Sequence, residues 1–187
     1  MIGAEVMLHY ENSVEMQLIL HCAPVLKGIK AGNTITLLIS DLDKVSCVIK
    51  DTEVHTKTLY QNNSVAVVLF YRRNQMLKVM NQVAYCAYLL QLGYRPLNVE
   101  ECFNQLRSKM YDYHNRRKVF PHELGVFLEY PLYDIQEFIR QGGKNCKLCG
   151  YWKVYDQEDD AKTIFKQYDQ ARNELLMNYQ DTGKLMI

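Results

Sequence analysis

Apolar and polar residues recur along the chain with two different periods, which predict both helices and strands. Apolar residues follow helical spacing through residues 14–23, 42–49, 76–90, 102–110, 132–139 and 161–179. Short β-branched or aromatic runs indicate strands at residues 34–39, 65–71, 124–128 and 150–155. The run at 65–71 is too short for a helix and has no polar side, so we expect a strand covered on both faces. Residues 51–63 are polar and irregular, and no element is predicted there.

Capping residues and turn residues place the ends of several elements. Asn12, with Glu15 three residues later, resembles a capping box for the first helix, and Pro24 should end or bend that helix. Asn98 is expected to cap the helix that follows it, and Pro131 fits the first position of another helix. The remaining signals are caps at Ser40 and Asp156, a turn at Gly32 and Asn33, and helix ends at Gly93, Gly142 and Gly143.

The order of these elements predicts an α/β fold, with α+β as the alternative, in which helices flank a mixed β-sheet of about four to five strands. A βαβ unit could join the strands near residues 34 and 65. The chain has no internal repeat, low-complexity tract or linker, and its 187 residues are 48% hydrophobic and 23% charged. We therefore expect residues 1–187 to form a single globular domain with a continuous core.

The charge of the chain is nearly balanced, because 22 basic and 21 acidic residues leave a formal net charge of +1. Such a chain has no general field that would gather nucleic acid or an anionic membrane, and we expect neither as a partner. The basic run at 116–118, beside Tyr111 and Tyr113, is interpreted as a solvated loop. Apolar runs too short to span a bilayer and an N-terminus without signal-peptide features predict a soluble, cytoplasmic protein.

Six cysteines are present, of which four lie singly in apolar patterns, where a reduced thiol packs as a small hydrophobe. Cys146 and Cys149 form the one CxxC, whose two thiolates could bind zinc or cycle as a dithiol. Zinc would need two further ligands, such as His122 with His114 or Cys22, and a redox motif would open a helix after a strand. We interpret both cysteines as structural and predict no metal, with zinc at Cys146, Cys149 and His122 as the alternative.

Two places in the chain carry residue types suited to catalysis. His122 and Glu123 follow Phe120 and Pro121 in a turn, and together they offer a general base with an acid, or two metal ligands. Cys22 would be a nucleophile if a distant histidine such as His122 came alongside. The structural interpretation is that His122 and Glu123 bond to the backbone or to solvent and that Cys22 is buried. Whether the protein is an enzyme stays open.

Basic and aromatic residues near the predicted turns are candidates for binding a ligand. Residues that could gather around a phosphate or carboxylate lie near turns or strand ends: Lys27, Lys30, Arg72, Arg73, Lys144 and Lys153. The chain has 14 tyrosines and one tryptophan, and Tyr151 and Trp152 lie in the predicted strand at 150–155. These aromatic side chains could line a pocket or form a protein interface, and core packing explains them as well.

Several segments carry a family resemblance. They are HCAPVLKGIK at 21–30, the strand ending in Tyr71 and Arg72, QLGY at 91–94, FPHELGVFLEYPLYDIQEFI at 120–139 and GYWKVY at 150–155. Over nearly its whole length the chain resembles a bacterial domain-of-unknown-function family, number 3793, found mostly in anaerobic Gram-positive organisms. The family pattern has glycine where this chain has Glu129, and it does not require Cys146 or Cys149. The resemblance implies a fold and a lineage, but no activity and no cofactor.

The function that these observations favour is a small-ligand-binding or partner-binding module, with its site around residues 120–123 and 150–155. The first alternative is an enzyme that acts on a small anionic substrate through Cys22 or through His122 and Glu123, with or without a metal. The second is a structural protein that forms a homo-oligomer through an exposed apolar patch of tyrosines and methionines. The sequence does not identify a cofactor, a substrate or a partner.

Overall fold

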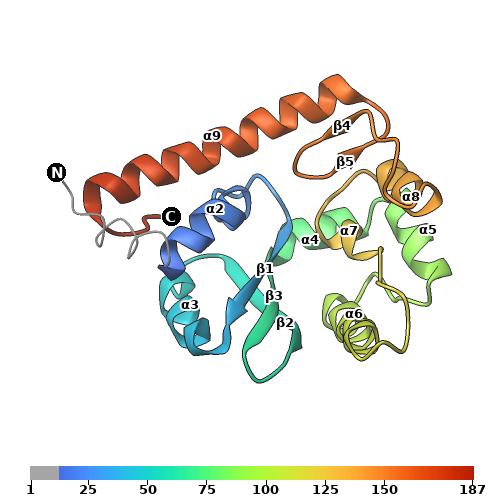
Figure 1. The fold of residues 1–187 in the computed structure, drawn as a ribbon, viewed down its shortest axis with the longest axis horizontal. Helices are drawn as coiled ribbons and strands as arrows, with labels where there is room; N and C mark the ends of the chain where they lie inside the picture. The colour runs from blue at the N-terminus through green and yellow to red at the C-terminus, as the bar shows by residue number, and fades with distance from the viewer. Residues whose placement is uncertain (1–12) are drawn as a thin grey trace.

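The structure is a computed structural model that describes residues 13–187, and Figure 1 shows its elements. The helices are α2 (Val14–Leu26), η1 (Ile39–Asp41), α3 (Leu42–Ile49), α4 (Arg73–Met80), α5 (Val83–Gln91), α6 (Val99–His114), α7 (Leu124–Phe127), α8 (Leu132–Arg140) and α9 (Glu158–Thr182). The strands are β1 (Gly32–Leu38), β2 (Val54–Gln61), β3 (Val65–Arg72), β4 (Leu148–Cys149) and β5 (Lys153–Val154).

The central sheet has the order β1-β3-β2, and both pairings are antiparallel. Along β3, Ala66, Val68 and Phe70 face a core formed with α2, α3 and the C-terminal part of α9. Leu69 and Tyr71 face the opposite core, which α4, α6 and α7 cover. The predicted strand covered on both faces is therefore confirmed, because β3 is buried between two helical layers.

The long helix α9 lies over α2 at one end and over the β4–β5 hairpin at the other (Figure 1). Trp152 and Val154 of the hairpin pack with Ala161 and Tyr168 of α9 in a third, smaller cluster. At the other end, the Tyr179 hydroxyl lies 3.1 Å from the hydroxyl of Ser13. α9 thus joins the hairpin to the sheet side of the molecule.

The predicted fold class is confirmed as α+β, with five strands flanked by helices in the described part of the chain. The strands form two antiparallel sheets, and the predicted βαβ unit is wrong because β1 and β3 are antiparallel neighbours. Gly32 and Asn33, predicted as a turn, belong to β1. Among residues 13–187, no helix has the length and apolar content that crossing a bilayer requires.

Two elements differ from the prediction because burial, and not periodicity, decides them. β2 occupies the region for which no element is predicted; it is an edge strand whose exposed residues, such as His55 and Thr56, are polar. Residues 124–127 form the helix α7, where a strand over 124–128 is predicted. Every residue of α7 is buried, and an apolar run that is buried all round has no period that separates helix from strand.

Helix ends also differ in detail. Asn12 lies outside the described residues, and Ser13 caps α2, since its hydroxyl accepts a hydrogen bond from the Met16 amide at 3.0 Å. Pro24 does not end α2. Because proline has no backbone N–H, the carbonyl of Leu20 loses its helical hydrogen bond, and Leu20 is an exposed residue. The helix predicted at 76–90 is two helices, α4 and α5, and the strand predicted at 150–155 is a two-residue strand in a hairpin.

The other caps are confirmed or shifted by a residue. Asn98 caps α6 by accepting a hydrogen bond from the Glu101 amide at 3.1 Å, as predicted. Pro131 is the N-cap residue of α8 and not its first helical residue. Asp41 and Gln157, in place of the predicted Ser40 and Asp156, precede α3 and α9, and neither makes a side-chain capping bond. Gly142 and Gly143 follow α8 with φ of 58° and 74°, as helix-ending glycines do.

Candidate functional site

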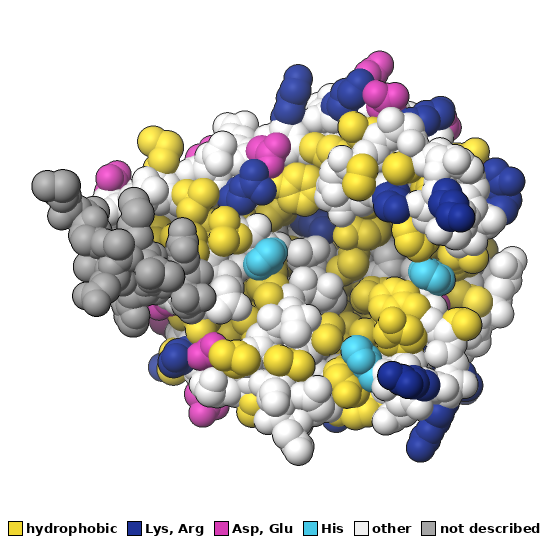
Figure 2. Space-filling view, viewed as in Figure 1, with side chains coloured by type: hydrophobic (Ala, Val, Ile, Leu, Met, Phe, Trp, Pro, Cys, Tyr) yellow, Lys and Arg dark blue, Asp and Glu magenta, His cyan; other side chains and the backbone are white. Residues whose placement is uncertain are grey.

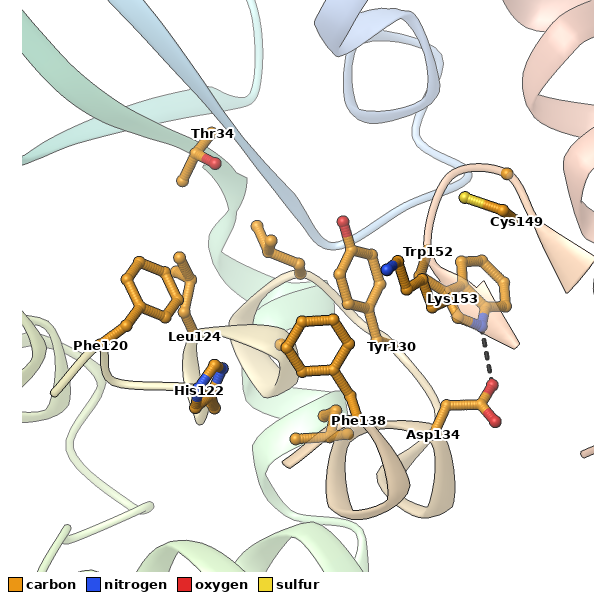
Figure 3. Close-up of a pocket in the computed structure, with 14 residues that line it drawn as sticks. Thr34, Phe120, His122, Leu124, Tyr130, Asp134, Phe138, Cys149, Trp152 and Lys153 are labelled. Atoms are coloured by element: carbon orange, nitrogen blue, oxygen red, sulfur yellow. Dashed lines mark hydrogen bonds between the residues drawn. The ribbon is translucent and has the colours of Figure 1, made fainter. Parts of the chain in front are cut away.

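A cavity of about 480 Å³ opens between β1, the α7–α8 segment and the β4–β5 hairpin (Figure 3). In the space-filling view, apolar side chains gather around a hollow in the middle of the face shown (Figure 2). Half of the residues that line the cavity are aromatic or aliphatic: Phe120, Leu124, Leu128, Tyr130, Ile135, Phe138 and Trp152. Thr34, His122, Asp134, Cys149 and Lys153 add polar atoms, and Gly125 and Gly150 complete the lining.

Asp134 fixes the wall that contains Trp152. Its carboxylate accepts one hydrogen bond from Trp152 Nε1 at 2.8 Å and two from the amides of Tyr155 and Asp156, at 2.8 and 3.2 Å. These bonds tie the hairpin to the first turn of α8. Because the carboxylate is buried and already accepts three bonds, it serves the architecture of the cavity and is not open to a ligand.

Aromatic contacts complete the cavity wall. The rings of Tyr130 and Trp152 stack with centroids 5.6 Å apart, and Phe165 of α9 meets the edge of Trp152 at 4.6 Å. Gly150 is required next to this group, because a Cβ there would lie 2.2 Å from a ring carbon of Phe165. Phe165 therefore packs against the side of the wall that faces away from the cavity, and the wall is formed without a ligand.

Lys153 and His122 are the basic side chains of the cavity. In Figure 3 the Lys153 side chain extends from the hairpin toward the ring of Tyr130. Its Nζ donates a hydrogen bond to the carbonyl of Gly143 at 2.5 Å and lies 5.8 Å from the centre of the Phe138 ring. The His122 ring lies between Phe120 and Phe138, with its centre 5.3 Å from each.

A second lysine, Lys30, is buried behind Tyr130. Its ammonium lies 5.1 Å from the centre of the Tyr130 ring and 5.6 Å from that of Tyr168, and it donates to Asn33 Oδ1 at 2.8 Å. Burial lowers the pKa of Lys30 from 10.5 to about 8, and the nearby Cys22 and Glu129 oppose this shift. No pattern in the sequence separates Lys30 from the exposed lysines, because burial depends on which segments cover the side chain.

Glu129 has a backbone conformation that glycine adopts freely. Its φ is 56°, in the left-handed region, which residues other than glycine seldom adopt. The Glu129 side chain accepts a hydrogen bond from the Ala31 amide at 2.6 Å. Burial raises the pKa of Glu129, while the bond to Ala31 and the charge of Lys30 oppose the rise. In this chain Glu129 therefore links the α7–α8 turn to the start of β1.

The three residues predicted as catalytic serve different parts of the structure. Cys22 lies in α2 and is fully buried in the core, and this burial raises the pKa of its thiol far above the ordinary value, so the nucleophilic thiolate is suppressed. The Glu123 carboxylate accepts bonds from the Tyr94 hydroxyl at 3.0 Å and from Lys109 Nζ at 2.5 Å. His122 alone of the three lines the cavity.

Among the predicted ligand-binding residues, Trp152 and Lys153 line the cavity. Lys27 forms an ion pair with Glu174 at 3.2 Å, and Lys144 is exposed. Arg72 caps the end of α2, donating to the carbonyls of Val25 and Leu26 at 2.7 Å each, and it also pairs with Glu53 at 2.6 Å. The Tyr151 hydroxyl donates to Asp169 at 2.9 Å.

The CxxC lies on the hairpin, at the edge of the cavity. Cys146 is half-buried and Cys149 is exposed, and both thiols are free. Cys149 lines the cavity together with His122, but within residues 13–187 no three His, Cys, Asp or Glu side chains are grouped so as to hold a metal ion. The structure thus places two of the three residues of the zinc alternative at one cavity without a complete ligand set.

The comparisons with known proteins identify the family. No curated protein and no solved structure matches the chain. A family model described as "Protein of unknown function (DUF3793)" matches residues 18–186. That match covers nearly the whole chain, including every element that builds the cavity. The protein therefore belongs to the DUF3793 family.

Proposed function

We propose that the protein is a small-molecule-binding module whose ligand occupies the cavity lined by Phe120, Tyr130, Phe138 and Trp152. The observation that carries the proposal is the cavity itself, whose volume of about 480 Å³ lies within the range of ligand pockets, ~300–1,000 Å³. Its walls come from three separate parts of the chain and are braced by Asp134 and by Phe165. Such a preformed space favours binding, because little ordering is needed when the ligand enters.

Catalysis through the predicted residues has less support. A general base must lie within hydrogen-bond reach of the proton it takes and needs a partner to orient it. Two carboxylates are candidates to orient His122: Glu123, which follows it in the chain, and Asp134, which lines the same cavity. Tyr94 and Lys109 engage the first, and Trp152 with two backbone amides engages the second. The enzyme alternative is thus reduced to His122 alone.

We further infer a cytoplasmic setting and one globular domain. All six cysteines are free thiols, as is usual in a reducing compartment. The two main core clusters lie on opposite faces of one sheet, and α9 packs with both the sheet side and the hairpin. A chain held together in this way is expected to unfold in one cooperative transition.

Binding can be tested with N-phenyl-1-naphthylamine, a neutral apolar probe that fluoresces when it leaves water. Thr34 lines the cavity, whereas Thr36 lies two residues further along the same face of β1 and is exposed. We expect the wild-type protein and the Thr36→Phe variant to bind the probe, and Thr34→Phe to lose binding because its ring fills the cavity. No binding by the wild-type protein, or equal binding by both variants, would refute the proposal.

Self-association is a second candidate, favoured by the surface around α5. This helix buries Leu89, while Val83 is 87% exposed and Leu90 is 56% exposed, and Leu97 beyond it is 84% exposed. Residues 81–94 contain no charged side chain, so a second copy related by a two-fold axis would meet this surface without charge repulsion. Light scattering checks it: a dimer that Val83→Asp converts to a monomer supports this function, and a wild-type monomer contradicts it.

A further inference from the structure

Lys153 places an unpaired positive charge in a mostly apolar cavity. An ammonium group has three N–H donors, and the Lys153 group uses one of them on the Gly143 carbonyl. Within residues 13–187, no carboxylate forms an ion pair with Lys153, although thirteen other ion pairs are formed there. Two donors of a half-buried cation are therefore left to face the cavity (Figure 3).

The other charged residue of the lining does not neutralise Lys153. Asp134 directs both carboxylate oxygens at Trp152 and at the amides of Tyr155 and Asp156. These three donors stabilise the negative charge of the Asp134 carboxylate beside the indole N–H. An anion in the cavity would therefore meet the free N–H groups of Lys153 without competing with a carboxylate already bound to them.

The rest of the cavity limits what such an anion can be. Away from Lys153, the lining offers few hydrogen-bonding side chains, chiefly Thr34, His122 and the hydroxyl of Tyr130. A nucleotide or a sugar would bury several polar groups there without partners, and each unpaired group weakens binding. A phosphate dianion would also need more than one lysine to balance its charge. The lining thus fits a molecule with an apolar body and one singly charged end.

From this geometry we infer that the ligand is an amphipathic monocarboxylate, an alkyl or arylalkyl acid. Its carboxylate accepts hydrogen bonds from Lys153 Nζ, and its apolar body lies against Phe120, Phe138 and Trp152. This inference rests on the proposed function, since it assigns the chemical class of the ligand of the same cavity.

Three probes with the same tail and different ends test the inference: decanoate, 1-decanol and decylammonium, each used below its micelle concentration. Trp152 is the one tryptophan of the chain and lines the cavity, so its fluorescence reports binding directly. In the wild-type protein we expect decanoate to bind about 10-fold or more tightly than 1-decanol, because a charged hydrogen bond is added to the same apolar contact. Decylammonium should bind most weakly.

The variant Lys153→Met keeps the length of the side chain and removes its charge. We expect it to lose the preference for decanoate while binding 1-decanol as the wild-type protein does, which also shows that the cavity is intact. Lys144→Met, at an exposed lysine outside the cavity, changes the net charge equally and should keep the preference.

Each outcome separates the two proposals. If 1-decanol binds and decanoate shows no preference over it, the monocarboxylate inference is overturned while the binding function stands. If none of the three probes changes the Trp152 fluorescence, both are overturned. The comparison between probes in the wild-type protein needs no variant, so it decides the inference even if Lys153→Met does not fold.

Discussion

The replacement Lys30→Met tests how a buried charge affects the stability of this fold. Lys30 is 3% exposed, and its ammonium lies between the rings of Tyr130 and Tyr168 with one hydrogen bond, to Asn33. Burial lowers its pKa from 10.5 to about 8, and Cys22 and Glu129 are the titratable groups that oppose the shift. Methionine has nearly the same length and carries no charge, so the replacement removes the charge with little change in packing.

The size of the effect follows from the pKa. A difference of one in pKa corresponds to ~1.4 kcal/mol, so a change from 10.5 to about 8 makes the charged lysine about 3 kcal/mol less favourable in the folded protein. Methionine avoids this loss but gives up the bond to Asn33 and the contact with the two rings, each worth ~1 kcal/mol. At pH 7 we therefore expect Lys30→Met to increase the free energy of unfolding by roughly 1 kcal/mol.

The effect of Lys30→Met on stability should depend strongly on pH. Because the folded pKa lies below the unfolded one, the unfolded chain binds more protons between about pH 8 and 10.5, and this group adds stability as the pH rises through that window. Cys22 and the buried tyrosines have raised pKa values and lower the stability at high pH, but they are present in both proteins. The stability difference between variant and wild type should thus fall by about 2–3 kcal/mol between pH 7 and 10.

Urea unfolding of the wild-type protein, Lys30→Met and the exposed control Lys144→Met at several pH values measures these differences. The control should follow the wild-type protein across the whole range. A variant whose stability differs from that of the wild-type protein by a constant amount at every pH would refute the reasoning. Strong destabilisation of Lys30→Met at pH 7 would do the same, because it would show that the buried ammonium is a net stabilising group.

Three further changes test other parts of the site. Asp134→Ala leaves the indole N–H of Trp152 and two backbone amides without their acceptor. We therefore expect the free energy of unfolding to fall by ~2–4 kcal/mol and the Trp152 emission to shift to the red. Unchanged emission would contradict the role of Asp134 in holding the indole ring. Gly150→Ala places a Cβ against Phe165 and should lower the unfolding free energy by ~1–3 kcal/mol; a melting temperature equal to that of the wild-type protein would show that Phe165 moves freely. Iodoacetamide followed by mass spectrometry should label the exposed cysteines in the native protein and leave Cys22 unlabelled until unfolding, and early labelling of Cys22 would disprove its burial.

Local signals in the sequence determined those elements whose chemistry is complete within a few residues. Asn98 caps α6 because its side chain reaches the amide of Glu101, three residues ahead. The turn after α8 follows from Gly142 and Gly143, which take the left-handed conformation without strain. The apolar run of β3 predicted a strand buried on both faces, and its two core clusters confirm it.

The proposed cavity also has a counterpart in the sequence pattern. The pattern predicts a ligand site around residues 120–123 and 150–155, and the cavity lies between these segments with Trp152 and Lys153 in its lining. The alternation of aromatic and basic residues in 150–155 reflects the short strand β5, which borders the cavity. The partner of that strand, the bracing by Asp134 and the contact with Phe165 depend on residues far along the chain, and the sequence pattern does not encode such distances.

Neighbours in the chain thus suffice to specify the buried strand β3, the Asn98 cap of α6 and the glycine end of α8. Packing between distant segments makes α7 a helix and β2 an edge strand, and it buries Lys30. It also separates Cys22, in the core, from His122, in the cavity. Burial is a property of the whole packing arrangement, and the same residue types take opposite roles depending on what covers them. The cavity exists for this reason: it is the space left between three segments whose positions are set by contacts elsewhere.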